Sequence, residues 1–166
     1  MIAARALSLL FLIALSGCGL RPMYAGGSNG AVASSLARIS VAPIPNRSGW
    51  LLRSALVDRL GGERAGATHR LEVELDDDIS GFGIRGDRSI TRERRTLRAR
   101  YRLVQVATGL VVLDATAGSD AGVDVVSSPY ATVAAEETAL ERLAEIVADQ
   151  MVARLALYAS NRPIAP

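Results

Sequence analysis

The chain has 166 residues, 49% of them hydrophobic, and a formal net charge of +2 at pH 7, which suits one globular domain and excludes a polycation. Its single cysteine, Cys18, excludes an internal disulfide and a thiolate metal cage. All 19 basic residues are arginines, whose guanidinium groups form two-pronged contacts with phosphates and carboxylates.

The first 17 residues have the layout of a secretory signal peptide. Arg5 gives a basic start, an apolar stretch runs from Ala6 to Leu15, and small residues follow. The apolar stretch is shorter than the about 20 residues that a membrane-spanning helix needs. Cys18 therefore lies at the expected cleavage point, and it is a buried apolar residue, a reactive nucleophile or a site of covalent modification.

This beginning resembles a bacterial lipoprotein precursor. Leu15, Ser16, Gly17 and Cys18 match the lipobox, the motif after which the cysteine becomes the lipidated first residue. The resemblance implies S-diacylglycerol and N-acyl groups on Cys18, and we expect no other cofactor. Each buried methylene contributes roughly 0.8 kcal/mol, so three acyl chains make a permanent anchor. Glycine rather than aspartate at position 19 implies sorting to the outer membrane, with the protein lipid-anchored at the periplasmic face.

The segment after the signal peptide, residues 18–37, is expected to be a lipidated N-terminus and a flexible tether. Residues 25–36 are small, polar and rich in glycine and serine, a composition typical of flexible linkers. A single α/β domain is predicted over residues 38–160, and a short C-terminal tail follows at 161–166.

A short strand and a helix are predicted to open the domain. Residues 38–44 have the pattern of a strand, which prolines end. The helix that follows has Ser48 as a candidate N-cap, one leucine stripe and a glycine pair as its stop signal. The stripe and the stop consist of Leu52, Leu56, Leu60, Gly61 and Gly62.

Three further strands are predicted to form a meander. On the first, residues 69–80, apolar side chains alternate with acidic ones, and on the second, residues 90–108, they alternate with arginines. A tight turn at Thr108 and Gly109 leads into the third, residues 110–119. The charged residues that share one face are Glu72, Glu74 and Asp76 on the first strand and Arg98, Arg100 and Arg102 on the second.

The strongest helical pattern follows a loop predicted at residues 119–131. The element order β-α-β-β-β-α predicts an α+β fold, with a four-stranded sheet and two helices packed on one face. The other face of the sheet is then polar and suits water or a hydrophilic partner. The apolar residues that recur at steps of three and four in the last helix are Leu140, Leu143, Val147, Met151, Leu155 and Tyr158.

Candidate catalytic and metal-binding residues are few. His69 begins a strand, and no G-x-S-x-G motif accompanies it. The run Asp76, Asp77 and Asp78 lacks the glycine turn and distal glutamate of a calcium loop. The glycine-rich residues 81–86 precede a strand rather than a helix, which excludes a dinucleotide loop. We therefore expect no metal site and no enzymatic activity.

Eight arginines lie within the eighteen residues 85–102. In one register, the acids of strand 69–80 neutralise the arginines of the facing strand, which stabilises a sheet by roughly 0.2–1 kcal/mol for each pair. The remaining arginines exceed their neighbouring acids, Asp87 and Glu93, and predict a basic tip that binds an anion. Export excludes nucleic acid, whereas lipopolysaccharide beside an outer membrane carries phosphates that suit arginine. The candidate binding residues are Arg85, Arg88, Arg92, Arg94 and Arg95.

Four segments together resemble the LptE family of lipopolysaccharide-assembly lipoproteins, in the form found in alphaproteobacteria. They are GCGLRPMY at 17–24, the strand, turn and helix at 39–60, RARYRLV at 98–104 with the turn at 108–109, and residues 128–158.

The resemblance implies a two-helix, four-strand domain inside the β-barrel of LptD, where it plugs the lumen and assists delivery of lipopolysaccharide to the cell surface. Large outer-membrane barrels have polar interiors that can hold a plug. The resemblance also implies lipopolysaccharide contact near the loop between the second and third strands, where Arg85 matches best. A second contact near the start of the last helix has no basic counterpart in residues 131–140.

One alternative shares the same features. An auxiliary lipoprotein of a lipid-transporting ABC system also has a lipobox, a tether and a small α/β domain. A periplasmic hydrolase is a third class, but it needs a nucleophile and a base that we do not find in this chain.

Overall fold

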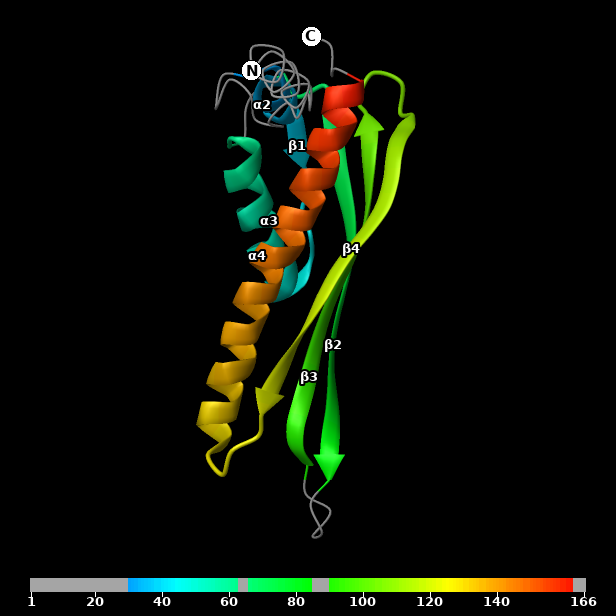
Figure 1. Ribbon diagram of the computed structural model, residues 1–166. Coiled ribbons are helices and arrows are strands. Elements are labelled where there is room, and N and C mark those ends of the chain that lie inside the picture. The colour runs from blue at the N-terminus through cyan, green and yellow to red at the C-terminus, as the bar shows by residue number, and fades with distance from the viewer. Residues whose placement is uncertain (1–29, 63–65, 85–89, 163–166) are drawn as a thin grey trace, which may run out of the picture.

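The structure is a computed structural model that describes residues 30–62, 66–84 and 90–162. The α+β prediction is confirmed, because four strands form one sheet and two helices cover one of its faces (Figure 1). In chain order the elements are α2 (Ala31–Leu36), β1 (Ile39–Val41), α3 (Asn46–Leu60), β2 (His69–Ile84), β3 (Ile90–Gln105), β4 (Val111–Asp124) and α4 (Pro129–Asn161).

The strands lie in the order β1-β2-β3-β4. β1 is parallel to β2 and pairs only with its residues 69–71, so α3 serves as the crossover that a parallel pair requires. β2, β3 and β4 are antiparallel and much longer than β1. The long strands therefore extend well beyond β1 and α3, as Figure 1 shows.

One end of the molecule brings together segments that are distant in sequence. There the end of β2 and the beginning of β3 lie near the end of β4 and the first turns of α4, opposite the end that holds α2 and β1 (Figure 1). We call this the hairpin end, and it comprises residues 80–84, 90–95, 120–124 and 129–137.

The hydrophobic core lies between the sheet and the two helices. The odd-numbered apolar residues of β3 face the helices and are at most 1% exposed. The leucine stripe of α3 and the apolar stripe of α4 cover them, as the sequence pattern predicts. Burial of apolar surface contributes roughly 25 cal/mol per Å², so this layer supplies most of the stability. The β3 residues in it are Leu97, Ala99, Tyr101 and Leu103.

The predicted tether and the predicted helix start need correction. Helix α2 forms inside the stretch expected to be flexible, and Leu36 at its end is buried in the core. Helix α3 begins at Asn46 with Pro45 as its N-cap, so Ser48 is a buried helical residue rather than the cap. Its predicted stop is confirmed, because Gly61 adopts φ 94°, a left-handed conformation that glycine permits.

Two of the long strands exceed their predicted bounds, whereas β3 ends at Gln105, before the predicted residue 108. β2 continues to Ile84 and β4 continues to Asp124, so both loops are shorter than the glycine-rich and polar residues suggested. The cause is pairing across the sheet, since the β3–β4 register runs without a break from Leu97 opposite Ser119 to Arg92 opposite Asp124. Cross-strand partners override the weak strand preference of this segment.

Gly49 in α3 gives a first prediction. A Cβ atom there would lie 2.7 Å from the carbonyl oxygen and Cγ2 of Ile44, so Gly49→Ala forces the backbone to move. We expect the variant to lose about 1–3 kcal/mol in urea unfolding, as overpacking typically costs, although alanine ordinarily favours a helix. Gly122→Ala is the control, because a Cβ there meets no atom within 4 Å. Equal stability of the two variants would contradict this packing.

Candidate functional site: the charged open face of the sheet

The face of the sheet that the helices leave open carries rows of oppositely charged side chains. The predicted placement of the acidic face of β2 beside the arginine face of β3 is confirmed. In the register of the structure, Glu72 lies opposite Arg102, Glu74 opposite Arg100 and Asp76 opposite Arg98. Arg102 also forms an ion pair with each glutamate, at 3.6 Å from Glu72 and 3.3 Å from Glu74. β3 thus presents a row of arginines beside a row of carboxylates on β2.

A second row of carboxylates on β4 was missed in the sequence. Asp114 accepts two hydrogen bonds from Arg100, at 2.9 and 3.2 Å, and these bonds hold the pKa of Asp114 below its ordinary value. Asp120 and Asp124 lie on the same face farther along the strand. Their even-numbered spacing is the signal that could have revealed them, but the predicted strand ended at residue 119, before both of them.

The arginines of the hairpin end are therefore better neutralised than expected. Arg92 pairs with Asp124 at 3.0 Å, and Arg94 lies 3.6 Å from Asp120. The Arg94 guanidinium also stacks over the ring of Phe82, 5.3 Å from its centroid. The expectation that these arginines exceed their acids is wrong for the described members, because β4 supplies partners from a distant part of the chain. Arg85 and Arg88, like Cys18, lie outside the described residues.

Arg95 differs from the other candidates because it points to the helices. Its guanidinium donates two hydrogen bonds to Asp77, both at 2.8 Å, and a third of 3.1 Å to the backbone carbonyl of Glu136 in α4. The side chains of Arg95 and Asp77 are only 11% and 19% exposed. Arg95 therefore joins the sheet to the start of α4, and its guanidinium is not free for a ligand.

Removing one member of this pair should destabilise the fold strongly. We expect Asp77→Asn to lower the free energy of unfolding by about 3 kcal/mol, because a nearly buried guanidinium loses its charged partner. Asp114→Asn is the control, since its ion pair is exposed and exposed pairs contribute little to stability. Urea unfolding measures both, and a similar loss in the two variants would contradict a structural role for Arg95.

Two carboxyl groups meet beside Arg95. Glu93 of β3 and Glu136 of α4 share a hydrogen bond; partial burial, this bond and the charge of Glu93 raise the pKa of Glu136. Within the part of the chain that the structure describes, Oε2 of Glu93 is buried without a hydrogen-bond partner. A proton held between the two carboxyl groups relieves their repulsion.

This raised pKa predicts a pH effect. A carboxyl group with a higher pKa in the folded state binds more protons when folded, so its contribution to stability is present at low pH and declines as the pH rises through the raised pKa. We expect Glu136→Gln to stabilise the protein more at about pH 8 than at about pH 4. Urea unfolding at the two values measures this difference.

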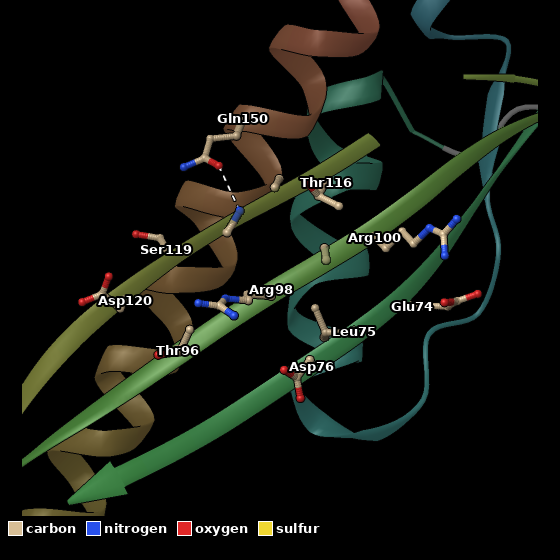
Figure 2. A pocket seen from close by; sticks show the side chains of 13 residues that line it. Glu74, Leu75, Asp76, Thr96, Arg98, Arg100, Thr116, Ser119, Asp120 and Gln150 are labelled. Carbon is tan, nitrogen blue, oxygen red and sulfur yellow. Dashed lines mark hydrogen bonds between the residues drawn. The ribbon is translucent and has the colours of Figure 1, made fainter. Parts of the chain in front are cut away.

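The open face is hollowed over β3 and the neighbouring parts of β2 and β4. The hollow has a volume of about 690 Å³, and Figure 2 shows Arg98 and Arg100 at its centre, pointing in opposite directions along β3. β4 contributes only small side chains there, and Gln150 of α4 accepts a 3.2 Å hydrogen bond from the backbone N–H of Gly118. The other residues around it include Glu74, Asp76, Thr96, Thr116, Ser119 and Asp120.

The remaining sequence candidates occupy structural positions. His69 is buried at the start of β2 beside the hydroxyl of Thr68, 3.0 Å from Nδ1, and burial lowers the pKa of His69. Asp77 faces the helices, whereas Asp76 and Asp78 point to the open face because side chains alternate along a strand. The three carboxylates therefore do not converge on one cation. Among the described residues, each helix is too short or too polar to cross a membrane.

A family model identifies the relationship. The model described as "LptE: Lipopolysaccharide-assembly" matches residues 36–155, which include every element from β1 to most of α4. The chain belongs to the LptE family. Membership assigns this LptE-family protein to lipopolysaccharide assembly and to the lipoproteins of the cell envelope, in a family that is not enzymatic. A search of curated protein sequences finds no match.

Solved structures share the LptE-family fold. A protein described as a lipoprotein from Caulobacter crescentus is 23% identical with a TM-score of 0.67, covering 80% of this chain and 100% of its own. Rare lipoprotein B from Shewanella oneidensis is 10% identical with a TM-score of 0.56, covering 74% and 95%. Lipoprotein B from Nitrosomonas europaea is 11% identical with a TM-score of 0.57, covering 74% and 83%.

Proposed function

We propose that this LptE-family protein is an outer-membrane lipoprotein, lipidated on Cys18 at the periplasmic face, that plugs and supports an LptD-type barrel during delivery of lipopolysaccharide to the cell surface. The family match over residues 36–155 carries the proposal. The lipobox at 15–18 and the signal-like residues before it support the anchor.

The charged open face supports the plug. Its side chains form a sheet of paired charges, which resembles in character the polar interior of a large barrel and has little apolar area to hide. Exposed ion pairs of this kind contribute little to folding, so a row of them is better explained as a surface that meets a polar wall.

The hairpin end supports a contact with lipopolysaccharide. Arg92 and Arg94 have side chains that are 63% and 56% exposed, and each can exchange its aspartate for a phosphate because exposed pairs are weak. In the sequence, Arg85 and Arg88 fall between the last residue of β2 and the first of β3, close to these two arginines. We include Arg95 only as the residue that holds this end together, since its guanidinium is bound within the fold.

Photocrosslinking in intact cells tests both parts of the proposal. A photoreactive amino acid replaces Phe82 at the hairpin end or, as the control, Val106 at the opposite end, both of which are exposed. We expect a lipopolysaccharide adduct from position 82 and none from position 106, and stoichiometric barrel in the tagged complex in both cases. Recovery of an ABC transporter without the barrel would instead support the alternative function. Recovery of the barrel without any lipopolysaccharide adduct would support the plug function and refute direct contact between the hairpin end and lipopolysaccharide.

A further inference from the structure

Arg98 is unlike the other arginines of the charged open face. Among the described arginines that β3 places on this face, Arg92, Arg94, Arg100 and Arg102 each form an ion pair. Arg98 forms none, and Asp76 across the strand pair is likewise without an ion pair in the described part of the chain. The guanidinium of Arg98 thus has no ionic partner, although it lies in the middle of a row of arginines that each have one.

The hollow around Arg98 arises from a missing side chain. Gly118 lies directly opposite Arg98 on β4, and a Cβ atom there would be 3.2 Å from both Cγ of Arg98 and the carbonyl oxygen of Leu97. Gly122 lies on the same face of β4, where a Cβ would meet no atom within 4 Å. At Gly118, unlike Gly122, a side chain would meet the stem of Arg98, so its absence leaves room for that stem beside the sheet.

The charges around the hollow select its occupant. A free guanidinium binds a carboxylate or a phosphate through paired hydrogen bonds. The charged residues that line the hollow are two arginines and three carboxylates, namely Arg98, Arg100, Glu74, Asp76 and Asp120. With more carboxylates than arginines, the hollow repels a glycolipid with several phosphates but accepts a single carboxylate among neutral or basic neighbours. The mixed signs therefore favour a protein surface over a lipid headgroup.

We propose that this hollow, with Arg98 at its centre, receives an aspartate or glutamate side chain from the inner wall of the barrel that the protein plugs. The inference rests on the proposed function and adds to it the face and the residue that dock. The open face, rather than the helical layer, then meets the wall at this point, and Gly118 provides the room for the incoming side chain.

Co-purification of the barrel with tagged full-length protein tests the proposal in its own cells. We expect Arg98→Glu to reduce the recovered barrel at least about tenfold after washing with high salt, because one carboxylate then faces another. Arg98→Met should reduce recovery less. Arg102→Met is the matched control, since that arginine is already paired with two glutamates on the same strand face, and we expect recovery within about twofold of the wild type.

Substitutions of the two β4 glycines provide an independent test. Gly118→Thr fills the hollow without changing a charge and should reduce barrel recovery, whereas Gly122→Thr, on the same face of the same strand, should not. Thermal unfolding of each purified variant verifies that it is folded. A photoreactive amino acid in place of Thr116, which lines the hollow, then locates the barrel residue that carries the carboxylate. Replacing that barrel residue with arginine should restore binding to the Arg98→Glu variant.

Three outcomes would overturn this assignment. Full barrel recovery with both Arg98→Glu and Gly118→Thr, when the wild type recovers barrel stoichiometrically, refutes the docking site and leaves the proposed function standing. If Arg98→Glu loses the lipopolysaccharide adduct from position 82 while barrel recovery is unchanged, Arg98 binds a phosphate of the lipid instead. Absence of barrel from the wild-type preparation refutes the proposed function and this inference with it.

Discussion

Leu143→Asp is expected to abolish the cooperative unfolding transition of the domain. Leu143 lies in the middle of α4, is 1% exposed and belongs to the core between the helices and the sheet. Truncating such a leucine costs about 2–5 kcal/mol, and an unpaired carboxylate adds a further penalty for its lost hydration. The sum is comparable to the about 5–15 kcal/mol that stabilises a typical domain.

Circular dichroism during heating and urea titration measures this effect. Ile146→Asp is the matched control, because Ile146 is in the same helix and 44% exposed. We expect the control to unfold cooperatively with a change of about 0.5 kcal/mol or less, as surface substitutions usually do. If both variants unfolded alike, the helix face assigned to the core would be wrong.

Cys18→Ala is expected to abolish acylation of the protein. The only thiol of the chain is the only candidate for the proposed thioether-linked lipid, and no second cysteine can replace it. The variant should keep residues 1–17 uncleaved or appear in the soluble fraction, and in either case its N-terminus should carry no acyl mass. Intact-mass spectrometry and membrane fractionation together measure both properties.

The control for this experiment is Ser16→Ala, which keeps a small residue beside the cleavage point and should leave acylation intact. Normal acylation of the Cys18→Ala protein at another position would disprove the anchor. Because the anchor and the plug are separate parts of the proposal, the soluble Cys18→Ala protein should still fold with unchanged thermal stability.

Much of the fold was readable from local patterns. Apolar residues at alternate positions of β3 predicted its buried face, and spacings of three and four predicted the buried face of α4. The acidic and basic runs on β2 and β3 also predicted that their charged faces lie side by side, which the structure confirms from Glu72 to Asp76. Each of these inferences depends on residues within one or two elements, where periodicity is a direct consequence of backbone geometry.

The candidate site could be predicted only in part, because it depends on contacts between residues that are distant in the sequence. Arg92 and Arg94 looked uncompensated because their aspartates lie more than twenty residues away, in a stretch of β4 that was taken for a loop. Arg95 resembles its neighbours in the sequence, but its odd-numbered position on β3 turns it to the helices, where Asp77 and the backbone of α4 meet it.

By itself the sequence determined the order of elements from β1 to α4, the core residues of α3, β3 and α4, and the lipobox around Cys18, because these depend on spacing along the chain. Only the tertiary structure decided where the long strands end, which arginines are paired and that Gly118 leaves a hollow beside Arg98. Those properties depend on three strands and a helix meeting in space. Side-chain charges are balanced by neighbours across the sheet, and neighbours along the chain do not reveal that balance.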